Sequence, residues 1–133
     1  NSTIFSKIKL NEGSKLTLEN VQIEKFGNNT IHAKDSEVIA KNSTITGGDL
    51  ENDFPPVWLK NVIWESENCK IELPTGTGIC LDNNVQFNSD SDRMTSINSY
   101  NSMIRAHQAT FTEFLGTTLG LSDIFLGWNW ESI

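Results

Sequence analysis

The sequence predicts an all-β chain wound into stacked coils, and two observations carry this prediction. A short phrase, apolar-x-apolar-x-Asn-small-x-apolar, recurs six times along the 133 residues. Its Asn falls at Asn1, Asn20, Asn42, Asn61 and Asn83 or Asn84, with Gln108 in the last copy. Steps of 19 to 24 residues are typical of a chain whose single turns are too small to bury their own apolar face. Abundant Asn, Ser and Thr also favour a turn-rich β protein.

Apolar residues alternate with period two on both sides of each recurring Asn. Around Asn20, they are Leu16 and Leu18 before it and Val21 and Ile23 after it. The phase slips by one residue at the Asn, which in a single strand would turn every later side chain to the opposite face. A corner removes this conflict if the Asn adopts the left-handed backbone conformation, which Asn tolerates better than most residues.

The recurring Asn residues are therefore predicted to stack at one tight corner. Their side-chain amides both donate and accept, so equivalent residues on successive coils can form a hydrogen-bonded ladder. The predicted ladder consists of Asn20, Asn42, Asn61 and Asn83 or Asn84. Because the fifth copy fits either Asn83 or Asn84, the pattern predicts one extra residue, a bulge, at that bend.

A third strand in each coil is predicted from weaker apolar segments. The candidates are Ile8–Leu10, Thr30–Ala33, Lys70–Leu73 and Met94–Ile97. Three short strands and three turns would close one coil, which gives about six coils in the chain.

This pattern resembles the right-handed parallel β-helix of the pectin-lyase-like superfamily. The likeness rests on the corner Asn residues and their inward-facing neighbours, and it covers residues 1–112. Residues 113–133 lose the Asn pattern and are expected to form a last coil, a cap or the start of a following domain. Because residue 1 falls on a corner, we expect the chain to be a fragment of a longer protein that lacks one or both caps.

Composition disfavours several classes of partner. The formal net charge is −7, whereas phosphate backbones and anionic lipid surfaces select for basic proteins. No apolar run approaches the roughly 20 residues that a membrane helix needs, so no membrane insertion is expected. The two cysteines, Cys69 and Cys80, are 11 residues apart and are expected to be free thiols on opposite sides of a turn. We expect an extracellular or cell-surface location.

The most polar segment runs from Asn88 to Arg93 and is expected to be a loop. In it, Asp90 and Asp92 are candidate ligands for Ca²⁺, which prefers carboxylate oxygens. Arg93 is a candidate to neutralise a uronate. The alternative is a solvated acidic loop, since Asp, Ser and Asn are common turn formers.

Two tryptophans are assigned opposite roles by the alternation. Trp64 is expected to point inward, between Ile45 and Phe87 on the neighbouring coils. Trp58 is expected to point outward beside Ile39 and Arg105, where its ring could stack on a sugar. Contact with a covering segment of the parent protein is the alternative for Trp58, and Trp128 and Trp130 are expected to belong to a cap or a domain interface.

The resemblance leaves the function open, because this fold is used by lyases, hydrolases, phage tail spikes, adhesins and scaffolds. The paired aspartates and Gly-His-Gly of the hydrolase branch are absent, and His32 and His107 are isolated. We therefore expect a non-catalytic segment of a larger secreted or surface protein, bacterial in origin, with a polysaccharide or surface glycan as ligand. The alternatives are a polysaccharide lyase or glycoside hydrolase and, in second place, a phage tail spike segment. Beyond Ca²⁺, no cofactor is expected.

Overall fold

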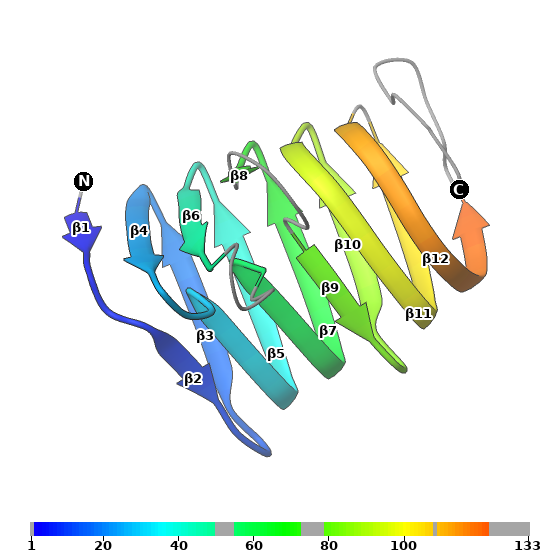
Figure 1. Ribbon diagram of the computed structural model, residues 1–133, viewed down its shortest axis with the longest axis horizontal. Coiled ribbons are helices and arrows are strands. Elements are labelled where there is room, and N and C mark those ends of the chain that lie inside the picture. The colour runs from blue at the N-terminus through cyan, green and yellow to red at the C-terminus, as the bar shows by residue number, and fades with distance from the viewer. Residues whose placement is uncertain (1, 50–54, 73–78, 108, 123–133) are drawn as a thin grey trace.

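The chain is a parallel β-solenoid, as the sequence predicts (Figure 1). The computed structural model describes residues 2–49, 55–72, 79–107 and 109–122, and of residues 95, 96, 107 and 110–122 it describes the backbone alone. The strands are β1 (Ser2–Ile4), β2 (Ile8–Leu10), β3 (Lys15–Glu19), β4 (Val21–Phe26), β5 (Ile31–Lys41), β6 (Thr44–Gly48), β7 (Val57–Glu67), β8 (Lys70–Glu72), β9 (Ile79–Asp82), β10 (Gln86–Asp90), β11 (Arg93–His107) and β12 (Thr110–Ser122). The described residues contain no helix.

Parallel pairing arranges the strands in three sheets that share the long strands. The first sheet contains β1, β4, β6, β8 and the beginnings of β11 and β12. The second contains β2, β9 and the first halves of β5 and β7, followed by the middle parts of β11 and β12. The third contains β3, β10 and the second halves of β5 and β7, followed by the ends of β11 and β12.

Left-handed residues make two of the bends between these sheets. Corner 2/3, where the chain passes from the second to the third sheet, is formed by Asp35, Asn61, Asn83, Asn84 and Asn101, with φ between 50° and 70°. Corner 3/1, from the third to the first sheet, is formed by Asn20, Asn42, Asn68 and Ser91, with φ between 51° and 57°. These are residue types that tolerate this conformation or can bond locally while adopting it.

The prediction that all the recurring Asn residues stack at a single corner is therefore wrong. Asn20 and Asn42 lie at corner 3/1, whereas Asn61, Asn83 and Asn84 lie at corner 2/3. Both corners require a left-handed residue between two strands with inward apolar positions, so both produce the same sequence phrase. The pattern consequently moves from one corner to the other between Asn42 and Asn61. The predicted third strand is wrong for the same reason. The prediction assigns its candidates to one sheet, but Lys70–Glu72 pairs in the first sheet and Ile8–Leu10 in the second.

Each corner carries its own amide ladder, exposed to solvent. At corner 2/3, Asn61 donates to Asp35 Oδ1 at 2.6 Å and Asn84 donates to Asn61 Oδ1 at 2.6 Å. At corner 3/1, Asn68 donates to Asn42 Oδ1 at 2.8 Å. The extra residue predicted at Asn83 and Asn84 is confirmed, because both residues have positive φ on a level where the other coils use one.

The solenoid has about four full turns, slightly fewer than the six predicted. In the first sheet, β4, β6, β8 and β11 have a partner on both sides. The difference lies at the two ends, where, within the residues that the structure describes, β1, β2, β3 and β12 each pair on one side only. β12 continues parallel to β11 beyond residue 112, and Trp128 and Trp130 lie outside the described residues.

The core is a column of inward side chains stacked from coil to coil. Trp64 is fully buried and its ring stacks on Phe87 with the centroids 5.6 Å apart, as the alternation predicts. Its neighbour on the other side is Val38, in register on β5, and not the predicted Ile45, which lies in the first sheet. Offset aromatic stacking adds to the hydrophobic stabilisation of this part of the third sheet.

Replacing Asn61 tests the ladder at corner 2/3. Asn61→Ala is expected to lower the free energy of unfolding by about 1–2 kcal/mol, because it places a Cβ-bearing residue without local bonding at φ 52° and removes two amide hydrogen bonds. Asn61→Gly keeps the backbone conformation accessible and is expected to cost less. Urea unfolding of both variants measures the difference, and equal stability of the two variants would contradict this account of the corner.

Candidate functional site

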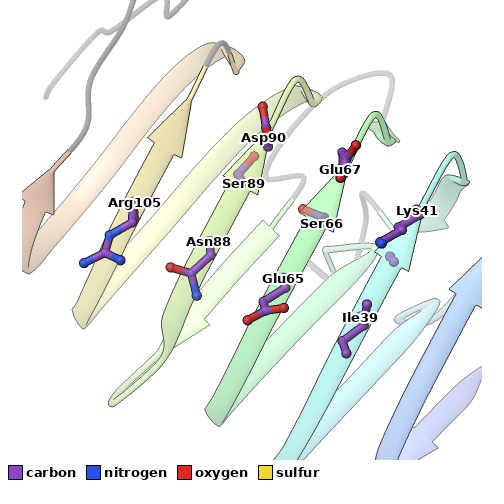
Figure 2. A pocket seen from close by; sticks show the side chains of 10 residues that line it. Ile39, Lys41, Glu65, Ser66, Glu67, Asn88, Ser89, Asp90 and Arg105 are labelled. Atoms are coloured by element: carbon purple, nitrogen blue, oxygen red, sulfur yellow. The ribbon is translucent and has the colours of Figure 1, made fainter.

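A shallow hollow of about 580 Å³ lies on the outer side of the third sheet (Figure 2). It extends across β5, β7, β10 and β11, which pair side by side. The register places its outward side chains in two rows across the strands. One row contains Ile39, Glu65, Asn88 and Arg105, and the other contains Lys41, Glu67 and Asp90. Parallel strands are about 4.8 Å apart and alternate residues about 6.6 Å apart, so these groups form a regular grid.

The charges of the hollow are ordered along the solenoid axis. Lys41 lies at one end and Arg105 at the other, with the carboxylates of Glu65, Glu67 and Asp90 between them (Figure 2). Hydrogen-bond donors therefore flank a group of acceptors, on a surface that also holds an aliphatic group.

Two half-buried side chains form the lower part of this surface. Ile39 contributes an apolar patch, and the Asn88 amide is held by donation from Nδ2 to the backbone oxygen of Trp64 at 3.2 Å. Because Trp64 is itself fixed in the core, this bond orients the Asn88 amide on a rigid support.

A buried polar network lies directly below the hollow. Asp92 is fully buried, and its Oδ2 accepts from the hydroxyls of Ser66 and Ser89, each at 2.5 Å. Its Oδ1 accepts from the backbone N–H of Cys69 at 2.8 Å, and Trp64 Nε1 donates to Ser66 at 2.8 Å. A buried carboxyl with this many partners is satisfied, and the network joins successive coils beside corner 3/1.

Burial raises the pKa of Asp92 above its ordinary value, and the charge of Asp90 acts in the same direction. The hydrogen bonds from Ser66, Ser89 and Cys69 oppose this effect. Burial also raises the pKa of the Cys69 thiol to about 11, which keeps it protonated at neutral pH. Neither Cys69 nor Cys80 is in a disulfide bond, as the sequence predicts.

The structure brings together only two of the predicted site residues. Arg105 and Asp90 both line the hollow. Asp92 faces the interior, and Arg93 is exposed at the beginning of β11 in the first sheet. Trp58 lies on the outer side of the second sheet, in register with His32 and Cys80, so its predicted position beside Ile39 and Arg105 is wrong.

The proposed Ca²⁺ loop is a strand end, a corner and a strand beginning. β10 ends at Asp90, Ser91 and Asp92 form the bend, and β11 begins at Arg93. The bend separates the two carboxylates, with Asp92 engaged in the interior and Asp90 half-exposed on the outer side. Among the described residues, no group of three or more His, Cys, Asp or Glu side chains is placed to hold a metal ion.

Of the residues that line the hollow, Lys41, Glu65 and Glu67 were not among the predicted site residues, and Asn88 was predicted only as the first residue of a polar loop. Each alternates with a buried neighbour on its strand, which is a visible sign that it points outward. Their convergence depends on the coil-to-coil register, and the misassigned corners hide that register in the sequence.

A comparison of the chain with known protein families, curated proteins and solved structures finds no match. Within the residues that the structure describes, no helix is long and apolar enough to cross a membrane. The proposals below therefore rest on the geometry and chemistry of this chain.

The raised pKa of Asp92 predicts a pH-dependent stability. The folded protein binds the Asp92 proton more tightly than the unfolded chain, so this contribution is fully present below the unfolded pKa of about 3.9 and is lost as pH rises through the folded pKa. Asp92→Asn is expected to remove this pH dependence from the free energy of unfolding. Asp82→Asn, on β9, is the matched control and is expected to leave the pH dependence unchanged. Urea unfolding between pH 3 and 8 (roughly the range over which carboxyls titrate) measures it, and parallel profiles for wild type and Asp92→Asn would refute the assignment.

Proposed function

We propose that this β-solenoid is a rigid, non-catalytic segment of a larger secreted or surface protein, and that it binds carbohydrate in the hollow of the third sheet. The observation that carries the proposal is the hollow itself, in which three carboxylates and the Asn88 amide lie between Lys41 and Arg105, with Ile39 at one end. We include in the proposal a kinship with the pectin-lyase-like β-helices, which the Asn ladders support.

The chemistry of the hollow suits sugar hydroxyl groups. A hydroxyl both donates and accepts, so it can donate to Glu65 or Asp90 and accept from Arg105 or Lys41. Hydrogen bonds that involve a charged partner are stronger than neutral ones. The aliphatic surface of Ile39 can contact the C–H groups of a sugar ring.

The rigidity of the scaffold supports binding of an extended ligand. The strands that carry the hollow are paired with neighbours on both sides, and Asn88 is anchored to the Trp64 backbone. Side chains held in place before binding lose little freedom when the ligand arrives, which favours affinity.

A binding role is favoured over a catalytic one by the position of Asp92. A general acid needs a raised pKa and contact with the substrate. Burial raises the pKa of Asp92, yet this side chain has no exposed surface and its oxygens are occupied by Ser66, Ser89 and Cys69. The carboxylates of Glu65, Glu67 and Asp90 are the groups that a glycosidase would use here, so hydrolysis is the alternative that the test must address.

Substitutions in the hollow test the proposal. A glycan array selects a neutral oligosaccharide, and calorimetric titration then measures its affinity. Arg105→Ala is expected to weaken binding by about tenfold, the effect of roughly one charge-assisted hydrogen bond, and Asn88→Ala by about fivefold, the effect of roughly one neutral hydrogen bond. Gln86→Ala, on the same strand as Asn88 but outside the hollow, is expected to change the affinity by less than about twofold.

Other results would point to the alternatives. Shortened or unsaturated sugars in the reaction mixture would indicate a hydrolase or a lyase and contradict the non-catalytic proposal. A trimeric mass in light scattering would favour a tail-spike segment. Absence of binding across the array, or equal losses for Gln86→Ala and Arg105→Ala, would refute the assignment of the hollow.

A further inference from the structure

A second outward surface, on the second sheet, combines lysines with two aromatic rings. It consists of Lys9 on β2, His32 and Lys34 on β5, and Trp58 and Lys60 on β7, and we call it the lysine–aromatic patch. It lies on a different sheet from the hollow, so the inference below goes beyond the proposed function and does not depend on it.

The strand register brings these residues together. Lys9, His32 and Trp58 are Cα partners in turn, and Lys34 is the partner of Lys60. Lys34 follows His32 by two residues, and Lys60 follows Trp58 by two, so all of them point to the same side of the sheet. Lys9 and Lys34 are exposed, and Trp58, His32 and Lys60 are half-buried.

The aromatic pair is fixed in orientation. The rings of His32 and Trp58 meet edge to face, with centroids 4.5 Å apart and an interplanar angle of 77°. This contact holds the Trp58 indole on the outer surface of the sheet. An indole presented in this way is a platform for the C–H face of a sugar ring.

The positive charge of the patch contrasts with the rest of the chain. The net charge is −7, yet Lys7, Lys9, Lys34 and Lys60, four of the ten Lys and Arg residues, surround this aromatic pair. Burial lowers the pKa of His32, and the charges of Lys7, Lys9 and Lys34 lower it further.

Two acidic residues lie near the patch: Asp35 follows Lys34, and Asp82 lies beside Lys60, because it follows Leu81, the Cα partner of Leu59. In the part of the chain that the structure describes, Lys9, Lys34 and Lys60 form no ion pair. The Asp35 carboxylate accepts the Asn61 amide at 2.6 Å in the corner ladder. Like charges on neighbouring strands are destabilising, so Lys34 beside Lys60 is a cost to the fold that an anionic ligand would remove.

We propose that the lysine–aromatic patch binds an anionic saccharide. Trp58 would stack against a sugar ring, and Lys9, Lys34 and Lys60 would contact its carboxylate or sulfate groups. A nucleic acid is disfavoured, because its dense phosphate charge is repelled by a chain with a net charge of −7. A saccharide with widely spaced anionic groups can be held by a local patch.

The test uses the full chain and three saccharide probes measured by calorimetric titration: an oligogalacturonate, a sulfated oligosaccharide and a neutral oligosaccharide. The first two distinguish a carboxylate from a sulfate as the recognised group, and tight binding of either supports the proposal. The double variant Lys34→Gln with Lys60→Gln is expected to lower the affinity for the anionic probe by at least about tenfold. Trp58→Ala is expected to lower it by a similar factor. Trp58→Phe retains a ring and is expected to lose less, which separates ring stacking from a general loss of structure.

The matched control is Lys25→Gln combined with Lys70→Gln. Both lysines are exposed on the first sheet, and the control changes the net charge by the same amount. It is expected to alter the affinity by less than about twofold. Equal losses for the two double variants, equal affinity for neutral and anionic probes, tighter binding of single-stranded DNA, or no binding of either anionic probe would each overturn the proposal. None of these variants lies in the hollow, so failure here leaves the neutral-sugar result for Arg105→Ala and Asn88→Ala unaffected.

Discussion

The left-handed residue at each corner is the constraint on which the rest of the structure depends. A strand with one buried face can turn and keep that face inward only if the phase of its side chains slips by one residue at the bend. Positive φ at Asn42 and Asn61 produces this slip at the two corners. Side-chain amides then bond from one coil to the next, which keeps the corners in register. The flat outer surfaces, and both proposed binding sites, follow from that register.

The sequence was sufficient to predict the fold but not the register of the coils. Period-two alternation and the recurring Asn predict an all-β stack, and the structure confirms it. The error concerns Asn61, which lies at a different corner from Asn42. Local sequence reports what one bend requires, and both bends require the same residue type. Which corner an Asn occupies depends on the pairing of distant strands, for example that Lys41 lies beside Glu67. This pairing could not be predicted from the single sequence.

The same long-range pairing explains which site residues were predicted and which were not. Arg105 and Trp58 were correctly predicted to face outward, because alternation along a strand is local. Their predicted proximity was wrong, because it depends on which strands are neighbours. Asp92 shows the complementary limit: it follows the left-handed Ser91 at a corner and faces the interior, although its surroundings in sequence resemble a solvated loop.

The arrangement of the two amide ladders can be tested directly by NMR of the folded chain. Nuclear Overhauser effects between the side-chain amide protons of one Asn and the side-chain protons of another report which residues are in contact. The account predicts contacts between Asn61 and Asn84 and between Asn42 and Asn68, with none between Asn42 and Asn61. Contacts that join Asn42 to Asn61 would show a single column of corner residues. That result would contradict the three-sheet register and, with it, the placement of both proposed sites.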